Sequence, residues 1–91
     1  MLRTGTVELT LIGKPGCHLC DDARDVLTHV IDGINQSGER SVLLTERSIL
    51  DDARLRQEYL EDIPVVLIGG KVHTFWRVDP IRLRTAILEG K

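Results

Sequence analysis

The sequence predicts an α/β domain in which four strands form a mixed sheet and helices cover both of its faces. Short β-rich segments alternate with segments whose apolar residues recur every three or four positions, in the order βαβαββα. With 91 residues the chain can build one hydrophobic core but not two, so residues 1–91 are expected to form a single domain. Right-handed βαβ crossovers and pairing of sequential strands leave few other arrangements.

The first strand and the first helix meet at a glycine-containing loop. Residues 7–12 are β-rich and largely alternate apolar and polar types, and residues 13–16 (GKPG) interrupt that pattern. A helix is predicted from residue 19 to a stop at residues 35–38 (NQSG). Its expected buried stripe consists of Leu19, Ala23, Val26, Leu27, Val30, Ile31 and Ile34.

The middle of the chain contains three strand candidates and one short helix. Residues 41–47, 63–68 and 71–76 are predicted strands, and the paired glycines between the last two predict a hairpin turn. Residues 51–59 are predicted to form a short helix. Its candidate core contacts are Ala53, Leu55 and Tyr59.

The last helix is predicted from its first two residues. Asp79 is suited to the N-cap, and Pro80 is favoured at the first helical position. The apolar residues that follow are Ile81, Leu83, Ala86, Ile87 and Leu88. This helix completes the predicted order.

Composition narrows the classes of function. Twelve Lys and Arg residues against 14 Asp and Glu residues give a net charge of −2, which does not favour nucleic acid or an anionic lipid surface. No apolar run approaches the roughly 18 residues that cross a bilayer. The first six residues (MLRTGT) lack the apolar stretch of a signal peptide. We therefore expect a cytoplasmic monomer that binds neither nucleic acid nor membrane.

Both cysteines lie in one four-residue segment, Cys17-His18-Leu19-Cys20. Two cysteines cannot build a framework of several disulfides, so this spacing indicates either thiol redox chemistry or metal ligation. Cys17 is predicted in the loop before the helix, where free backbone N–H groups and the helix dipole stabilise a thiolate. Cys20 is predicted one turn inside the helix. These positions assign Cys17 as the attacking and leaving thiol and Cys20 as the resolving thiol.

A metal or iron–sulfur site on the same two cysteines is the competing interpretation. A closed zinc site needs four ligands. Beyond Cys17, Cys20 and the neighbouring His18, the chain offers only His29 and His73, which lack the spacing of a ligand pair and are expected at the surface. The strand–loop–helix context favours dithiol redox chemistry over the metal site.

With these features in this order, the chain resembles the small glutaredoxin-like proteins of bacteria, within the thioredoxin-fold superfamily. The resemblance covers residues 6–89 and is carried by the GKPG loop before Cys17, by Ile63-Pro64 at the third strand, and by Gly69-Gly70 before the last helix. It implies a thioredoxin-like fold and a thiol–disulfide oxidoreductase. It implies no resident cofactor, with glutathione, another low-molecular-weight thiol or a reductase restoring the dithiol.

The resemblance also implies a substrate site. Pro64 is expected to follow a cis peptide bond beside the cysteines, and the backbone of Ile63 to pair with an extended disulfide-containing protein or a small thiol compound. Lys14 stands where many glutaredoxins have a lysine that contacts the glutathione carboxylate or favours the thiolate; the alternative is a solvated loop charge. His18 either favours the thiolate or is merely exposed on the first turn.

The chain departs from the glutaredoxin pattern in two places. His18 and Leu19 stand between the cysteines where Pro and Tyr are familiar, which removes an aromatic wall. Trp76 and Arg77 fall where paired glycines cradle glutathione, while Asp79 keeps the acidic position at the helix start. Trp76 and Arg77 are expected to narrow the groove or to recognise another ligand, unless the tryptophan plugs the core. A noncatalytic adaptor with this fold is the third interpretation.

Overall fold

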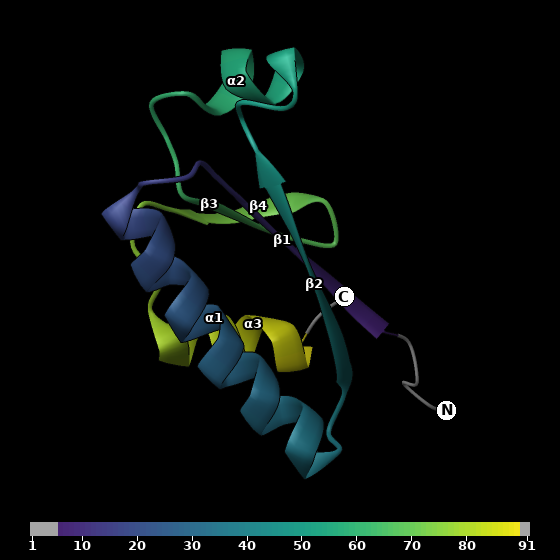
Figure 1. Cartoon of the computed structure of the whole chain (residues 1–91). Coiled ribbons are helices and arrows are strands. Elements are labelled where there is room, and N and C mark those ends of the chain that lie inside the picture. Colours follow the sequence, from purple (N-terminus) through teal and green to yellow (C-terminus); the bar gives the residue numbers. More distant parts are fainter. Residues whose placement is uncertain (1–5, 90–91) are drawn as a thin grey trace.

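The structure is a computed structural model that describes residues 6–89, and its elements follow the predicted order (Figure 1). The strands are β1 (Thr6–Gly13), β2 (Ser41–Ser48), β3 (Val65–Ile68) and β4 (Lys71–Phe75). The helices are α1 (His18–Ser37), α2 (Ala53–Tyr59) and α3 (Pro80–Glu89). Residues 1–5, on which most of the signal-peptide expectation depends, lie outside the described residues.

The four strands form one mixed sheet in the order β2-β1-β3-β4. β1 pairs in parallel with β2 and antiparallel with β3, and β3 pairs antiparallel with β4. Helices α1 and α3 lie side by side on one face (Figure 1). Helix α2 belongs to a separate cluster on the other face, because Ile12 and Val65 in that cluster alternate with Leu11 and Val66 in the first one. The predicted mixed sheet with helices on both faces is confirmed.

The larger core lies between the sheet and helices α1 and α3. Five residues of the predicted α1 stripe are buried in it: Ala23, Leu27, Val30, Ile31 and Ile34. Leu19, however, is 37% exposed, whereas Cys20 is buried. At 100° per residue, Cys20 falls within the stripe, while Leu19 and the partly buried Val26 fall on one margin of it. The prediction for Leu19 was therefore wrong.

A smaller core lies under α2. Ile12, Ile49 and Val65 are buried there, and the partly buried residues packed against them are Leu55, Tyr59, Ile63 and Leu67. Asp52 caps the helix, because its Oδ1 accepts hydrogen bonds from the N–H groups of Arg54 (2.9 Å) and Leu55 (3.2 Å). Ala53, a predicted core contact, is exposed in the first turn.

The predicted ends of the longer helices are confirmed. Gly38 ends α1 with φ 76°, and its N–H donates to the carbonyls of Ile34 and Asn35. Asp79 caps α3, because its Oδ1 accepts from the N–H groups of Ile81 (2.9 Å) and Arg82 (3.2 Å). Ile81, one of the apolar residues of this helix, is 77% exposed, because the first turn of α3 directs it away from the buried Leu83 and Ile87.

His73 on β4 is half-buried, whereas a surface position was expected, and His29 on α1 is exposed as predicted. Burial lowers the pKa of His73 below its usual 6.5, and the nearby positive charge of Arg82 lowers it further. The unfolded chain therefore binds a proton at His73 more readily than the folded chain does. Stability associated with His73 is present above about pH 6.5 and falls as the pH drops through that value.

We therefore expect His73→Gln to flatten the loss of stability between pH 7 and pH 5. Urea unfolding at both pH values would measure it, with His29→Gln as the matched control on an exposed histidine. The wild-type protein and His29→Gln should lose the same free energy of unfolding on acidification, and His73→Gln should lose less. An equal loss in all three proteins would contradict the assignment.

Candidate active site

Cys17 caps the N-terminus of α1. Its backbone is extended (φ −102°, ψ 113°), and its Sγ accepts a hydrogen bond of 3.1 Å from the N–H of Cys20. The carbonyl of Cys17 accepts from the N–H of Asp21 at 3.0 Å, as the first turn requires. The helix begins at His18, so Cys17 lies just before the helix and Cys20 inside it, as predicted. The sulfur of Cys17 thus occupies the position where unpaired N–H groups favour negative charge.

The two cysteines form a disulfide, with their Cα atoms 5.1 Å apart. Their access to solvent differs. Cys17 is half-buried, whereas Cys20 is only 1% exposed. Cys17 is therefore the more accessible residue of the pair, and Cys20 is almost completely covered.

Gly13, the last residue of β1, lies directly against Cys20. A Cβ placed on Gly13 would stand 2.8 Å from Cys20 Sγ and 3.2 Å from Cys20 Cβ. The carbonyl of Gly13 also accepts a hydrogen bond of 2.9 Å from the N–H of Ile49, which ties the strand end to the β2–α2 connection. The sequence pattern predicts Gly13 only as a turn residue, whereas the close contact with Cys20 requires glycine there.

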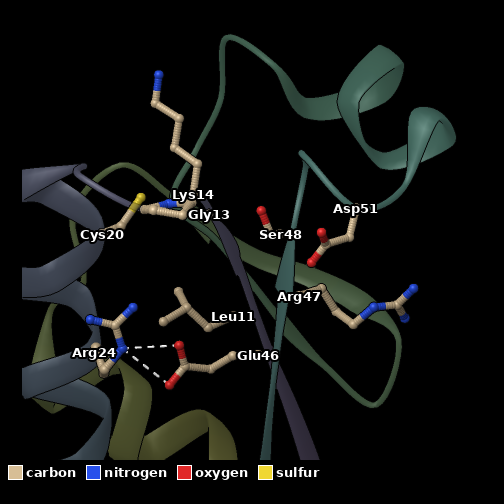
Figure 2. A pocket seen from close by; sticks show the side chains of 10 residues that line it. Leu11, Gly13, Lys14, Cys20, Arg24, Glu46, Arg47, Ser48 and Asp51 are labelled. Atoms are coloured by element: carbon tan, nitrogen blue, oxygen red, sulfur yellow. Dashed lines mark hydrogen bonds and ion pairs between the residues drawn. The ribbon is translucent and has the colours of Figure 1, made fainter.

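A hollow of about 350 Å³ opens beside Cys20, between the end of β1, the start of α1 and the end of β2 (Figure 2). Its lining residues are Leu11, Gly13, Lys14, Pro15, Cys20, Arg24, Glu46, Arg47, Ser48 and Asp51. The side chain of Lys14 extends away from the other labelled side chains, toward solvent (Figure 2). This arrangement places Lys14 at the rim of the hollow rather than inside it.

An ion pair links two walls of this hollow. Arg24 Nε donates to both carboxylate oxygens of Glu46, at 2.9 and 3.1 Å (Figure 2). Arg24 also donates to Asp21 at 2.9 Å. The hydrogen bond to Asp21, followed by that to Glu46, raises the pKa of Arg24. Sequence reasoning missed Arg24 and Glu46, because only the register that pairs Leu11 with Glu46 brings β2 to this place.

Pro64 lies next to the cysteine pair by register. The peptide bond between Ile63 and Pro64 is cis, and Pro64 is buried. Ile12 of β1 pairs with Val65 of β3, so extending this antiparallel register by one residue puts Pro64 opposite Gly13, which touches Cys20. Ile63 is half-buried and packs into the smaller core.

The residues after β4 lie in two different places, a hollow beside α1 and the N-terminus of α3. Trp76 and Arg77 line a hollow of about 170 Å³ together with Leu19, Asp22, Ala23, Val26 and Val78. Trp76 is 54% exposed and is therefore not a plug of the core. Asp79 lies outside this hollow, and its Oδ1 is engaged in capping α3. The structure thus brings Trp76 and Arg77 to the first turn of α1, and it leaves Asp79 at the start of α3.

Of the three histidines, only His18 is next to a cysteine in the chain, and the three do not gather at one place. His18 and His29 are exposed and lie roughly 16 Å apart along α1, at 1.5 Å per residue. Within residues 6–89, no group of three or more His, Cys, Asp or Glu side chains is arranged to hold a metal ion. Over the same range, no helix is both long and apolar enough to cross a membrane.

The sequence of the chain is similar to one known family and to several curated proteins. A family model described as Glutaredoxin-like domain (DUF836) matches residues 8–88. Uncharacterized proteins of Mycobacterium tuberculosis and Mycobacterium bovis are 26% identical to the chain over 80 residues, covering 88% of this chain and 81% of theirs.

Two solved structures share the fold. The X-ray structure of a structural genomics target protein from X. campestris matches with a TM-score of 0.70 and 29% identity, over 91% of this chain and 99% of that one. Oxidized mitochondrial thioredoxin 3 from Saccharomyces cerevisiae matches with a TM-score of 0.64 and 15% identity, over 91% of this chain and 77% of that one. The thioredoxin-like fold predicted from the sequence is confirmed.

The contact between Gly13 and Cys20 predicts a large effect of a single methyl group. Gly13→Ala should destabilise the oxidised protein by about 1–3 kcal/mol, because the added Cβ overlaps the sulfur of Cys20. Urea unfolding of the oxidised protein would measure the change.

Gly33→Ala is the matched control. Gly33 is exposed on α1, and no atom lies within 4 Å of the place that a Cβ would take there, so alanine should stabilise the helix by about 0.5–1 kcal/mol. If Gly13→Ala unfolded at the same urea concentration as the wild-type protein, the close contact would not exist in solution.

Proposed function

Because the chain belongs to the glutaredoxin-like domain family, whose model matches residues 8–88, we propose that it is a thiol–disulfide oxidoreductase acting through Cys17 and Cys20. The observation that carries the proposal is the difference between the two sulfurs. Cys17 is accessible at a helix N-terminus, where its Sγ accepts the N–H of Cys20. Cys20 is buried against Gly13. The Cys17 thiol thus reacts with the substrate, and the Cys20 thiol reacts only with Cys17.

The reaction proceeds in two exchanges. The Cys17 thiolate attacks one sulfur of the substrate disulfide, the substrate S–S bond breaks, and the departing thiolate takes a proton from water. Cys20 then loses its proton and attacks Cys17 in the mixed disulfide. The second substrate thiol leaves, and the Cys17–Cys20 disulfide forms. Two electrons pass from the dithiol to the substrate, which is reduced to two thiols.

The helix N-terminus serves both exchanges. In the first, the N–H of Cys20 and the positive end of the α1 dipole increase the fraction of Cys17 present as thiolate. In the second, the same groups stabilise Cys17 as the leaving sulfur when Cys20 attacks it. Both effects depend on Cys17 occupying the N-cap.

The substrate is proposed to bind across the end of the sheet. The backbone at Ile63, preceding Pro64, would pair with an extended disulfide-containing segment, and the register that sets Pro64 opposite Gly13 supports this. Lys14 would meet a carboxylate from the rim of the Cys20 hollow, and exposed His18 would adjoin Cys17. Asp79 would offer only the oxygen that does not cap α3.

Neither a resident cofactor nor a metal is part of this proposal, because the two electrons reside in the dithiol itself. Glutathione, another low-molecular-weight thiol or a reductase would restore the dithiol. The protein is proposed to act as a cytoplasmic monomer on disulfide-containing proteins or small thiol compounds, without binding nucleic acid or membrane. Visible absorbance of anaerobically purified protein would instead indicate an iron–sulfur module, and absence of turnover would indicate an adaptor.

The two roles predict different outcomes for the two serine variants. Reduced Cys17→Ser should fail to form any mixed disulfide with bis(2-hydroxyethyl) disulfide, because Cys20 is out of reach. Reduced Cys20→Ser should form one mixed disulfide at Cys17 and stop there. Mass spectrometry of the protein after a single turnover distinguishes these products.

Single turnover of the fully reduced protein avoids any assumption about its reductant. The wild-type protein should release both substrate thiols and end with its own disulfide. If Cys17→Ser instead accumulated the adduct and Cys20→Ser did not, the roles of the two cysteines would be reversed.

A further inference from the structure

Trp76 adopts a backbone conformation that side chains disfavour. Its φ of 65° is the only positive value at a non-glycine residue within residues 6–89. Such conformations persist where the surroundings hold them, and they gather at functional sites. Trp76 therefore occupies a position at which glycine would be less strained, and more than half of the residue lies exposed at the surface.

Two hydrogen bonds hold Trp76 in this conformation. Its backbone N–H donates to the carbonyl of Pro64 at 2.7 Å, and its indole Nε1 donates to the carbonyl of Glu61 at 3.2 Å. Both acceptors belong to the segment between α2 and β3. The backbone of Trp76 and its indole are thus each fixed to the segment that carries the cis peptide bond, yet just over half of the residue stays exposed.

The fixed indole is part of an apolar surface beside the cysteines. Leu19, the residue between His18 and Cys20, shares the 170 Å³ hollow with Trp76. The ring of Phe75 lies 6.3 Å from that of Trp76, centroid to centroid, and is also exposed. We call this surface, formed by Leu19, Phe75 and Trp76, the apolar rim. The rim links the first turn of α1 to the end of β4.

The hollow within the rim suits a side chain better than a whole small ligand. At about 170 Å³ it is smaller than the roughly 300 Å³ at which pockets begin to enclose small molecules. The charged residues lining it are Asp22 and Arg77, one of each sign, so it offers no net positive charge to a compound with two carboxylates such as glutathione. An apolar side chain would fill the hollow without leaving a charge unpaired.

We propose that the apolar rim makes the protein select polypeptide disulfides in which an apolar or aromatic residue flanks the reacting cysteine, in preference to glutathione disulfides. This inference rests on the proposed function and names its substrate class. The flanking side chain enters the hollow between Leu19 and Trp76 while Cys17 attacks the adjacent sulfur. An exposed aromatic ring that is already immobilised loses little conformational freedom when a partner packs on it.

The experiment compares matched substrates in single turnover. Two octapeptides, identical except for Phe or Ser next to one cysteine, each carry a disulfide to the same small thiol, and glutathione disulfide is the third substrate. The reduced wild-type protein should react about tenfold faster with the Phe peptide than with the Ser peptide. It should react more slowly with glutathione disulfide than with the Phe peptide.

Substitutions in the rim should remove this preference. Trp76→Gly suits the positive φ while deleting the ring, and the ratio of the Phe and Ser rate constants should fall toward one. Leu19→Ser, on the opposite side of the hollow, should lower the ratio independently. Ile81→Ser is the control, because this side chain is exposed on α3 outside the rim; both its rates and its ratio should match the wild-type protein.

Fluorescence gives a second measurement that needs no variant. Trp76 is the only tryptophan in the chain, so its emission reports directly on the rim. Oxidised wild-type protein is titrated with the two peptides after their cysteine is replaced by serine, which prevents disulfide exchange. The Phe peptide should shift the emission at lower concentration than the Ser peptide does.

Disulfide reduction with equal rates for the Phe and Ser peptides would overturn the inference and leave the proposed function standing. An unchanged ratio in folded Trp76→Gly and Leu19→Ser would do the same. Reduction of glutathione disulfide at least as fast as of the Phe peptide would also overturn it. If the reduced wild-type protein reduced none of the three disulfides, the proposed function itself would fail, and the inference with it.

Discussion

The close approach of Gly13 to Cys20 is the constraint on which the rest of the site depends. β1 lies between β2 and β3 in the sheet, so its last residue stands where the main segments of the site converge. The missing side chain of Gly13 leaves room for the sulfur of Cys20, and its carbonyl holds the N–H of Ile49. The register sets Pro64 on its other side. A larger residue would push the helix start away from the sheet.

This constraint separates the environments of two chemically identical thiols. Burial against Gly13 removes Cys20 from solvent, and the N-cap position leaves Cys17 accessible. The hollow beside Cys20 and the apolar rim lie on different sides of the pair, since one is lined by β2 and the other by the residues that follow β4. The cysteine pair is thus flanked by a charged surface on the side of β2 and by a largely apolar surface on the side of β4.

Local signals were enough to predict the elements, and their limits explain the errors. Asp79 and Gly38 carry caps that depend only on neighbouring residues, so both helix ends could be predicted. Leu19 and Cys20 differ by one step on the helix, and the helical period itself puts Cys20 within the buried stripe and Leu19 on its margin, so this error came from counting a marginal residue as core. The pairing of Arg24 with Glu46 depends on parallel register, which leaves no mark in either segment. The left-handed backbone of Trp76 could not be predicted from the sequence either, because carbonyls distant in the chain, those of Pro64 and Glu61, hold it.

The ion pairs around β2 also bear on the solubility of the protein. Among the described residues 6–89, β2 is an edge strand that pairs in the sheet with β1 alone, and its outer N–H and C=O groups could add a strand from another chain. Glu46 and Arg47 are exposed on it and engaged with Arg24 and Asp52. Exposed pairs of this kind add only about 0.2–1 kcal/mol each to stability. Their larger effect is to put fixed charges along an open edge, where an approaching strand would have to strip them of water and partners, so the sheet is guarded against aggregation.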